Sequence, residues 1–293
     1  QMLADADIAV ANMEFPLAGE PYTGYPAFSA PDRYAAYAAD CGIDVFLTAN
    51  NHILDKGAAG LRRTLEIYDT MHESKGIHHT GTAADEKADT TANPLIVVGR
   101  GIRIAMVNFT YGTNAGGSSQ WPSVRRASRE QVAQDIARAK SRGADYIIAL
   151  PHWGEEYVLR HGKWQQDWAE WLVSQGVDII IGTHPPVGQD TTSIGRVPVI
   201  YSLGNAISNM SAPNTRLELA ATVRFVRHYD GSTEMLLPEL TWMWCTLPGM
   251  LTSGYATIPV ESYLGKRDEW INPSDYDNMV ATYQRVKKAT GID

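Results

Sequence analysis

The stretch Gly143-Ala144-Asp145-Tyr146-Ile147-Ile148 decides the fold class of this chain. Small residues and an aspartate lead into an apolar run, and a polar side chain, His152, stands where the run ends. Short, near-continuous apolar runs are typical of strands that are buried on both faces of a parallel sheet. The same pattern, with small variations, occurs at residues 6–11, 42–47 and 176–181.

The segments between these runs carry helical patterns. Ser128 and Gln131 form a capping box that predicts a helix start. Trp164, Trp168 and Leu172 recur at helical spacing, as do apolar residues within 56–75. Alternation of strands and helices predicts an α/β fold built from βαβ units.

The pattern changes after Arg196. Residues 197–203, 217–226 and 233–244 are expected to be strands without long helices between them, and 274–288 a last helix. No low-complexity linker interrupts the chain, so we expect one domain over residues 1–293, in which 211–293 supply second-sheet strands and the final helix.

The overall charge limits the class of partner. The chain has 293 residues and a formal net charge of −8, which argues against nucleic acid, because phosphate binding requires clustered Lys and Arg. Cys41 and Cys245 lack metal-ligand spacing, and whether they pair stays open. No apolar run is long enough to cross a bilayer. The sequence enters its first apolar run almost at once, and we expect a further segment to precede Gln1 in a longer protein.

Polar side chains follow four successive predicted strands, and in open α/β sheets ligands bind beyond these strand ends. The residues are Asn12 and Glu14, then Asn50, Asn51 and His52, then His152, Trp153 and Glu156, then Thr183 and His184. Imidazole and oxygen ligands without thiolates suit Zn, Mn, Fe or Mg. Two such cations, bridged by a carboxylate, are a common arrangement for phosphoester cleavage.

Each residue also has a simpler explanation. Asn50-Asn51-His52 is compatible with a turn and helix cap, and a lone His152 or His184 with a hydrogen-bonded structural role. Their joint placement at strand ends favours a site. Two other candidate metal motifs fail. A zincin motif that starts at His72-Glu73 requires a second histidine where Gly76 stands. His78 and His79 would point to opposite faces of a strand, so both cannot be ligands.

Five short motifs also stand in order along the chain. They are Ala11-Asn12-Met13-Glu14, Ala49-Asn50-Asn51-His52 with Asp55, Pro151-His152-Trp153-Gly154 with Glu156, Gly182-Thr183-His184-Pro185, and Tyr201-Ser202-Leu203-Gly204-Asn205. Over residues 5–206 the chain resembles the CapA family of poly-γ-glutamate capsule biosynthesis proteins, whose fold is similar to that of calcineurin-like metallophosphatases. The resemblance implies a four-layer α/β/β/α sandwich. It also implies an extracytoplasmic cell-envelope protein, anchored to the membrane through an N-terminal segment, with capsule polymer or its precursors and membrane-bound capsule synthesis subunits as partners.

The resemblance further implies roles for individual residues. Divalent cations such as Mn, Zn, Fe or Mg would bind Glu14, Asn51, His152 and His184. Glu14 would stand near the bridging carboxylate and take part in catalysis, and His52 would act beside the substrate oxyanion as general acid. The expected substrate contacts are Asn12, Asn50, Trp153, Glu156 and Asn205, the last from a tight turn.

Two departures from the family pattern matter. The strand ending in Gly-Asp that usually opens the family is not among these residues, and Pro186 stands where a second histidine ligand is usual. Three hypotheses therefore stay open. The first is a metal-dependent hydrolase or transferase of capsule metabolism, the second a catalytically degenerate polymer-binding or assembly subunit, and the third a general metallophosphoesterase.

Overall fold

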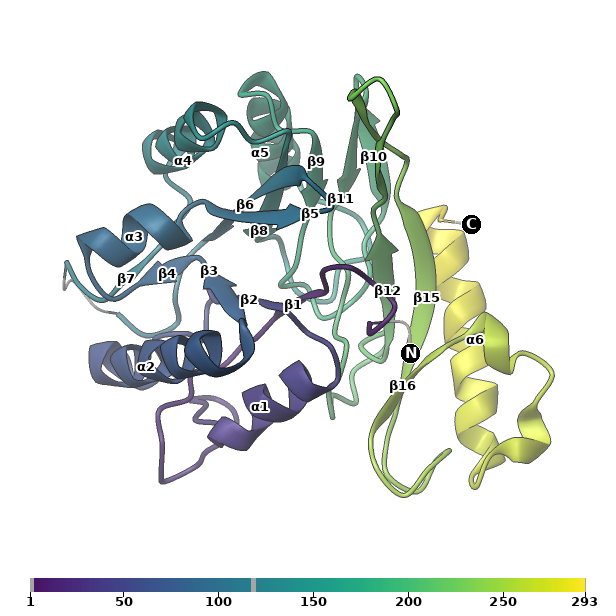
Figure 1. The fold of residues 1–293 in the computed structure, drawn as a ribbon. Coiled ribbons are helices and arrows are strands. Elements are labelled where there is room, and N and C mark those ends of the chain that lie inside the picture. The colour runs from purple at the N-terminus through teal and green to yellow at the C-terminus, as the bar shows by residue number, and fades with distance from the viewer. Residues whose placement is uncertain (1–2, 117–119, 293) are drawn as a thin grey trace. The chain divides into compact units, whose positions relative to one another are not determined.

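The computed structural model describes residues 3–116 and 120–292 and has mixed α/β content. The chain forms two compact units, Gln1–His152 with Gln175–Val177 and Trp153–Ser174 with Asp178–Asp293. The single-domain organisation stays a prediction. Figure 1 follows the chain through both units.

Parallel strands form the framework of the first unit. β1 (Val10–Asn12), β2 (Val45–Leu47) and β3 (His78–Thr80) pair in parallel, with Val10 opposite Val45 and Val45 opposite His78. β5 (Leu95–Gly99) pairs antiparallel with β6 (Ile102–Thr110), which pairs in parallel with β8 (Tyr146–His152). A short antiparallel pair joins β4 (Thr82–Ala83) and β7 (Ser123–Val124). Three of the four apolar runs thus form the predicted parallel strands of this unit.

The described residues of the first unit form the helices α1 (Asp32–Asp40), α2 (Gly57–Lys75), α3 (Glu86–Ala92) and α4 (Arg129–Ser141). The predicted start of α4 is confirmed, because the Ser128 side chain accepts a hydrogen bond from the Gln131 N–H. One apolar cluster joins Ala35 of α1, Phe46 of β2 and Tyr68 of α2. α1 and α2 therefore pack beside the β1–β3 sheet, as Figure 1 shows.

The second unit starts with α5 (Lys163–Ser174) and the fourth apolar run, β9 (Ile179–Ile181). β9 pairs in parallel with β11 (Val197–Ile200), and β10 (Thr191–Ile194) pairs antiparallel with β11. Helix α5 confirms the helix that the tryptophan spacing predicted.

The remainder of the second unit is antiparallel. β12 (Leu217–Thr222) pairs with β15 (Glu239–Thr246), which pairs with β16 (Ala256–Pro259). β13 (Phe225–Arg227) and β14 (Thr233–Met235) form a hairpin, and two single turns, Glu261–Tyr263 and Arg267–Glu269, precede α6 (Pro273–Thr290). Leu219, Trp242 and Met279 belong to one buried cluster, which packs α6 on this sheet. The final helix is present as predicted. The strands predicted over 217–226 and 233–244 are each split in two, the first into β12 and β13 and the second into β14 and β15.

Two further observations concern membrane-spanning helices and the cysteines. Within the described ranges, no helix combines the length and the apolar character that crossing a lipid bilayer requires. Cys41, which is exposed, and Cys245, which is buried, are both free thiols.

Candidate functional site

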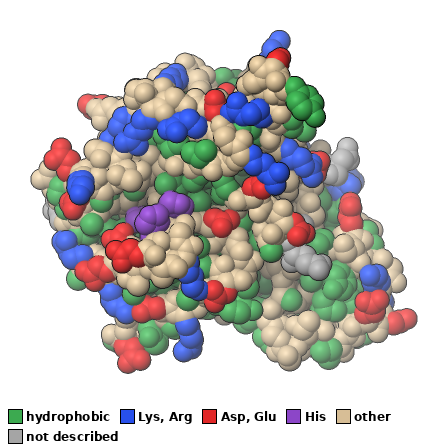
Figure 2. All heavy atoms as spheres, in the orientation of Figure 1, with side chains coloured by type: hydrophobic (Ala, Val, Ile, Leu, Met, Phe, Trp, Pro, Cys, Tyr) green, Lys and Arg blue, Asp and Glu red, His purple; other side chains and the backbone are tan. Residues whose placement is uncertain are grey.

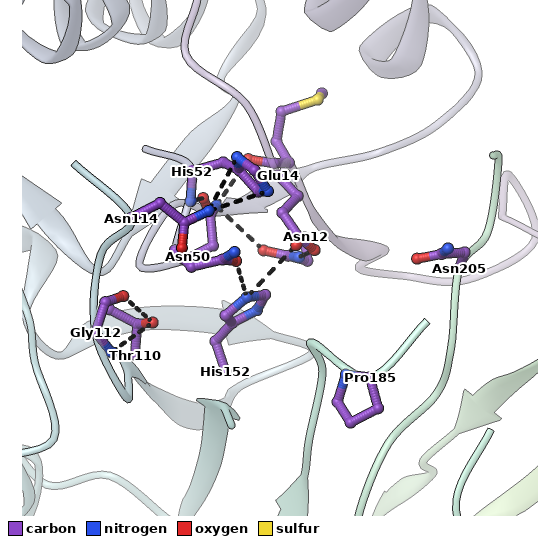
Figure 3. Close-up of polar contacts among 12 residues, drawn as sticks. Asn12, Glu14, Asn50, His52, Thr110, Gly112, Asn114, His152, Pro185 and Asn205 are labelled. Carbon is purple, nitrogen blue, oxygen red and sulfur yellow. Dashed lines mark hydrogen bonds and ion pairs between the residues drawn. The ribbon is translucent and has the colours of Figure 1, made fainter. Parts of the chain in front are cut away.

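Three strands of the first unit end beside one another and present the predicted polar residues. Asn12 and Glu14 follow β1, Asn51 and its neighbours follow β2, and His152 is the last residue of β8. Figure 3 shows the side chains of Asn12, Glu14, Asn50, His52 and His152 gathered around one point. The strand-end prediction therefore holds for these five residues within the first unit.

His152 lies at the centre of this group. Its side chain is fully buried, and its Nε2 atom is 2.8 Å from Asn51 Oδ1 and 3.7 Å from Glu14 Oε1. The Glu14 side chain keeps 30% of its surface exposed. One imidazole nitrogen therefore faces an amide oxygen and a carboxylate oxygen, and the carboxylate remains open to solvent or substrate.

Asn12 and Asn50 hold this arrangement in place. The Asn12 amide donates to Glu14 Oε2 at 3.0 Å, which orients the carboxylate toward His152. Asn50 is completely buried, and its amide donates to the Met13 carbonyl at 2.9 Å and to Asn12 Oδ1 at 3.4 Å. These hydrogen bonds give both residues a positioning role. Their predicted contact with substrate stays a prediction.

Asn108, in β6, ties the strand ends together. Its Oδ1 accepts from the Ala49 N–H at 2.9 Å, and its Nδ2 donates to the Leu150 carbonyl at 2.7 Å. A Cβ at Gly81, where φ is +103°, would lie 2.1 Å from Asn108 Oδ1. Only glycine fits there, so the close approach of the loop after β3 to Asn108 depends on Gly81.

His52 forms a second feature beside the first group. Its Nδ1 is 2.7 Å from Asp55 Oδ2, which also accepts from the Phe28 N–H at 2.8 Å. The Phe28 and His52 rings meet edge to face at 4.6 Å between centroids. Asn114 Nδ2 lies 3.4 Å from His52 Nε2. With its proton on Nδ1 directed at the buried carboxylate, the ring presents Nε2 for proton transfer.

The residues predicted from the second unit have their own local geometry. His184, which follows β9, is buried and has a φ of +102°, a conformation that residues other than glycine rarely adopt. Such strain is often found at functional positions. Trp153 is fully buried and donates from Nε1 to the Tyr201 carbonyl at 2.8 Å.

Glu156 is exposed, and Asn205 is half-buried with its amide 3.3 Å from Met210 Sδ. The roles of these four residues of the second unit as ligand or substrate contacts stay predictions.

The first-unit donor set fits a divalent cation. Two ligand atoms that each lie about 2.1 Å from a metal are about 3.0 Å apart when the ligand–metal–ligand angle is about 90°. They are about 3.4 Å apart in a tetrahedral site. The distances of 2.8 and 3.7 Å from His152 Nε2 to its two oxygen neighbours are close to these values. A carboxylate, an amide oxygen and an imidazole also match the preferences of Zn, Mn and Fe.

Sequence reasoning missed part of this site. Asn108 lies inside an apolar strand, and its partners are 59 and 42 residues away, so no local pattern indicates its role. Asn114 falls in the stretch 111–124 that reads only as a polar loop. Asp55 did carry a signal, because it follows His52 at a spacing of three residues.

The first comparison, with solved structures, concerns the fold. The chain is similar to a solved structure from Staphylococcus aureus, named as a candidate 5'-nucleotidase in complex with alpha-ketoglutarate. The TM-score is 0.53 at 15% identity, covering 80% of this chain and 44% of that one. This likeness confirms the expected α/β fold. The four-layer order stays a prediction.

The family follows from the sequence. The model of the family "Bacterial capsule synthesis protein PGA_cap" matches residues 1–210, and the chain belongs to that family. It is 27% identical over 225 residues to the capsule biosynthesis protein CapA of Bacillus anthracis, covering 73% of this chain and 53% of that protein. It is 28% identical over 179 residues to the PGA biosynthesis protein CapA of Bacillus subtilis, covering 60% and 46%. The chain thus spans about half the length of these curated relatives.

Proposed function

We propose that this protein is a cation-dependent hydrolase or transferase of poly-γ-glutamate capsule metabolism, working at the cell envelope. The observation that supports it most is the fully buried His152, whose Nε2 faces Asn51 Oδ1 and Glu14 Oε1. An imidazole nitrogen that faces a carboxylate oxygen and an amide oxygen at these distances brings together three atoms of the kind that bind a divalent cation. Membership of a capsule synthesis family supports the biological role.

The proposed cation ligands are Glu14, Asn51 and His152, and we propose His184 as a further ligand because of its strand-end position and its strained backbone. A bound divalent cation would supply Lewis-acid polarisation of the scissile ester or amide group. The chain's own residues would do the rest. Asn12 would keep Glu14 oriented through its 3.0 Å hydrogen bond.

His52 is the proposed proton-transfer residue. Asp55 fixes the ring through Nδ1 at 2.7 Å. Nε2 would then give a proton to the leaving group or take one from the attacking nucleophile. The edge-to-face contact with Phe28 limits rotation of the ring, so the proton is held at one place.

A long polyanion would need local recognition on this protein. Figure 2 shows acidic and basic side chains interspersed over the face in view, and the formal net charge is −8. Broad electrostatic attraction of a carboxylate polymer is therefore not available on this face. The cation and the residues around it are the proposed attachment point for one carboxylate or amide of the polymer.

Metal retention tests the first half of the proposal. The protein is loaded with Mn²⁺ or Zn²⁺, freed of excess metal and measured by elemental analysis. We expect about one cation per chain in the wild type and at least about a tenfold weaker affinity in His152→Ala and in His184→Ala. His228→Ala, which changes an exposed histidine of the β13–β14 region, is the matched control. No metal in the wild type, or equal metal in all variants, would contradict the proposal.

Capsule production tests the second half. His52→Ala should retain the cation, since Nε2 of His152 is untouched, and should fail to restore capsule polymer in cells that lack the parent gene. Restored polymer would instead favour a polymer-binding or assembly subunit without chemistry. Pro186 favours that second candidate, because proline offers no donor atom where the family usually has a histidine. Turnover of generic phosphoesters by the purified protein would favour a general phosphoesterase.

A further inference from the structure

A pocket of about 320 Å³ lies within the second unit, between α5 and β10. His161, Glu170, Ser193 and Tyr201 are among its lining residues. This volume is roughly that of ten water molecules, taken at about 30 Å³ each, so a small organic molecule fits better than a single ion. None of these residues has a role in the proposed capsule chemistry.

His161 is held rigidly at the pocket wall. Its ring stacks on the Tyr201 ring, with 3.8 Å between centroids and 10° between planes. Its Nδ1 is 3.1 Å from Asp190 Oδ2, and its backbone N–H donates to Asp190 Oδ1 at 2.9 Å. Asp190 is buried. In the tautomer whose Nδ1–H donates to this carboxylate, Nε2 is a hydrogen-bond acceptor.

The other polar groups of the pocket also include acceptors. Glu170 Oε1 accepts from the Gln166 amide at 2.8 Å, which fixes the carboxylate in place. Tyr201 is almost fully buried, and burial together with Asp190 and Glu170 raises its pKa to about 12, so the hydroxyl stays neutral. Thr192 and Ser193 also line the pocket. They are neighbours on β10, so their side chains point to opposite faces and one hydroxyl at most joins this set.

The charge of the lining selects the sign of the ligand. Neither Lys nor Arg is among the described residues that line the pocket, and Glu170 contributes a negative charge. Arg160 Nη1 lies 3.4 Å from Asp190 Oδ2, so its charge is directed at that carboxylate. A carboxylate or phosphate ligand would face repulsion here, whereas a cation is attracted.

We propose that this pocket binds a primary alkylammonium ion, that is, a short aliphatic chain ending in an amine. The ammonium has three N–H donors, which match Glu170, His161 Nε2 and the hydroxyls of the wall. Ile194, also in the lining, offers an apolar side chain to the methylene groups. The pocket thus serves a cationic metabolite or side chain rather than the anionic polymer.

Titration with 1,4-diaminobutane in the presence of EDTA tests this proposal, followed by calorimetry and by amide chemical shifts. We expect saturable binding with shifts at Thr192 and Ser193. Glu170→Gln should weaken it about tenfold or more, the effect of losing one charge-assisted hydrogen bond. His161→Phe, which keeps a ring on Tyr201 but removes Nε2, should also weaken it.

Asp167→Asn is the matched control. It removes a carboxylate from the same helix that pairs with Lys163 and does not line the pocket, so affinity should stay within about twofold. Circular dichroism checks that each variant is folded. Three results would overturn the proposal. These are no saturation by about 10 mM diamine, equal weakening by Asp167→Asn and Glu170→Gln, or equal binding of uncharged 1,4-butanediol.

Discussion

Replacing Glu218 by glutamine is expected to stabilise the second unit at neutral and alkaline pH. Glu218 lies within β12, opposite Met243 of β15, and is 3% exposed. Its Oε2 atom has no hydrogen-bond partner. Burial raises the pKa of this carboxyl well above its ordinary value of 4.5. The folded protein therefore keeps a proton that the unfolded chain releases.

The sign of the pH dependence follows from this difference. Below about pH 4.5 the carboxyl is neutral in both states, and burial of the charge costs nothing. As the pH rises, the unfolded chain gains from ionisation while the folded protein must hold the proton or bury a charge. The contribution of Glu218 to the free energy of unfolding therefore decreases as the pH rises from about 4.5 to the raised pKa of the folded protein.

The size of the effect can be worked out. Glutamine does not ionise, so it avoids a loss of about 1.4 kcal/mol for each pH unit over which the unfolded chain is ionised and the folded protein is not; one to two such units correspond to about 1–3 kcal/mol. Unfolding 293 residues at about 2.1 cal/mol/K per residue changes the entropy by about 0.6 kcal/mol/K. Glu218→Gln should therefore raise Tm by about 2–5 °C near pH 8 and by almost nothing near pH 4.

Thermal unfolding measures this directly, with the fluorescence of Trp242 and Trp244 as local probes, since both residues pair with β12. Glu269→Gln is the control, because Glu269 is exposed and should give no difference between the two pH values. Equal shifts for Glu218→Gln at low and high pH, or a loss of stability near pH 8, would refute the reasoning.

Three further predictions concern the first unit. Gly81→Ala should lower the free energy of unfolding by about 2–4 kcal/mol in urea, because its Cβ meets Asn108 and φ is +103°. Asp55→Ala should cost about 1–3 kcal/mol in the same assay, since the His52 ring loses its partner, with cation affinity unchanged in calorimetry. Burial lowers the pKa of His79 to about 4. Its stabilising effect is therefore present above about pH 6.5 and lost toward pH 4, and His79→Phe should flatten the acid side of a Tm profile.

The parts of the fold that depend on local pattern were predictable. The apolar runs before His152 and before His184 became β8 and β9, because a strand buried on both faces has little choice of residue. The Ser128 cap of α4 was readable for a similar reason, since a cap involves neighbours within three residues.

The parts that depend on distant contacts were not predictable. Helix α1 has no side-chain cap at its start, so its sequence gives little signal. The role of Asn108 requires Ala49 and Leu150 to lie on either side of β6, which is known only after the strands pair. Phe28 reaches Asp55 from a loop 27 residues earlier in the chain. The candidate site was thus predicted as a set of strand-end residues, but the contacts that orient them were not.

The backbone conformation of His184 has a consequence for how such a protein changes over generations. A φ of +102° favours glycine over any side chain with a Cβ. Selection for thermal stability alone would therefore replace this histidine, and laboratory evolution without a functional screen should drift toward glycine at this position. Retention of the imidazole under a screen for capsule formation, and its loss without one, would separate the demands of activity from those of folding at a single codon.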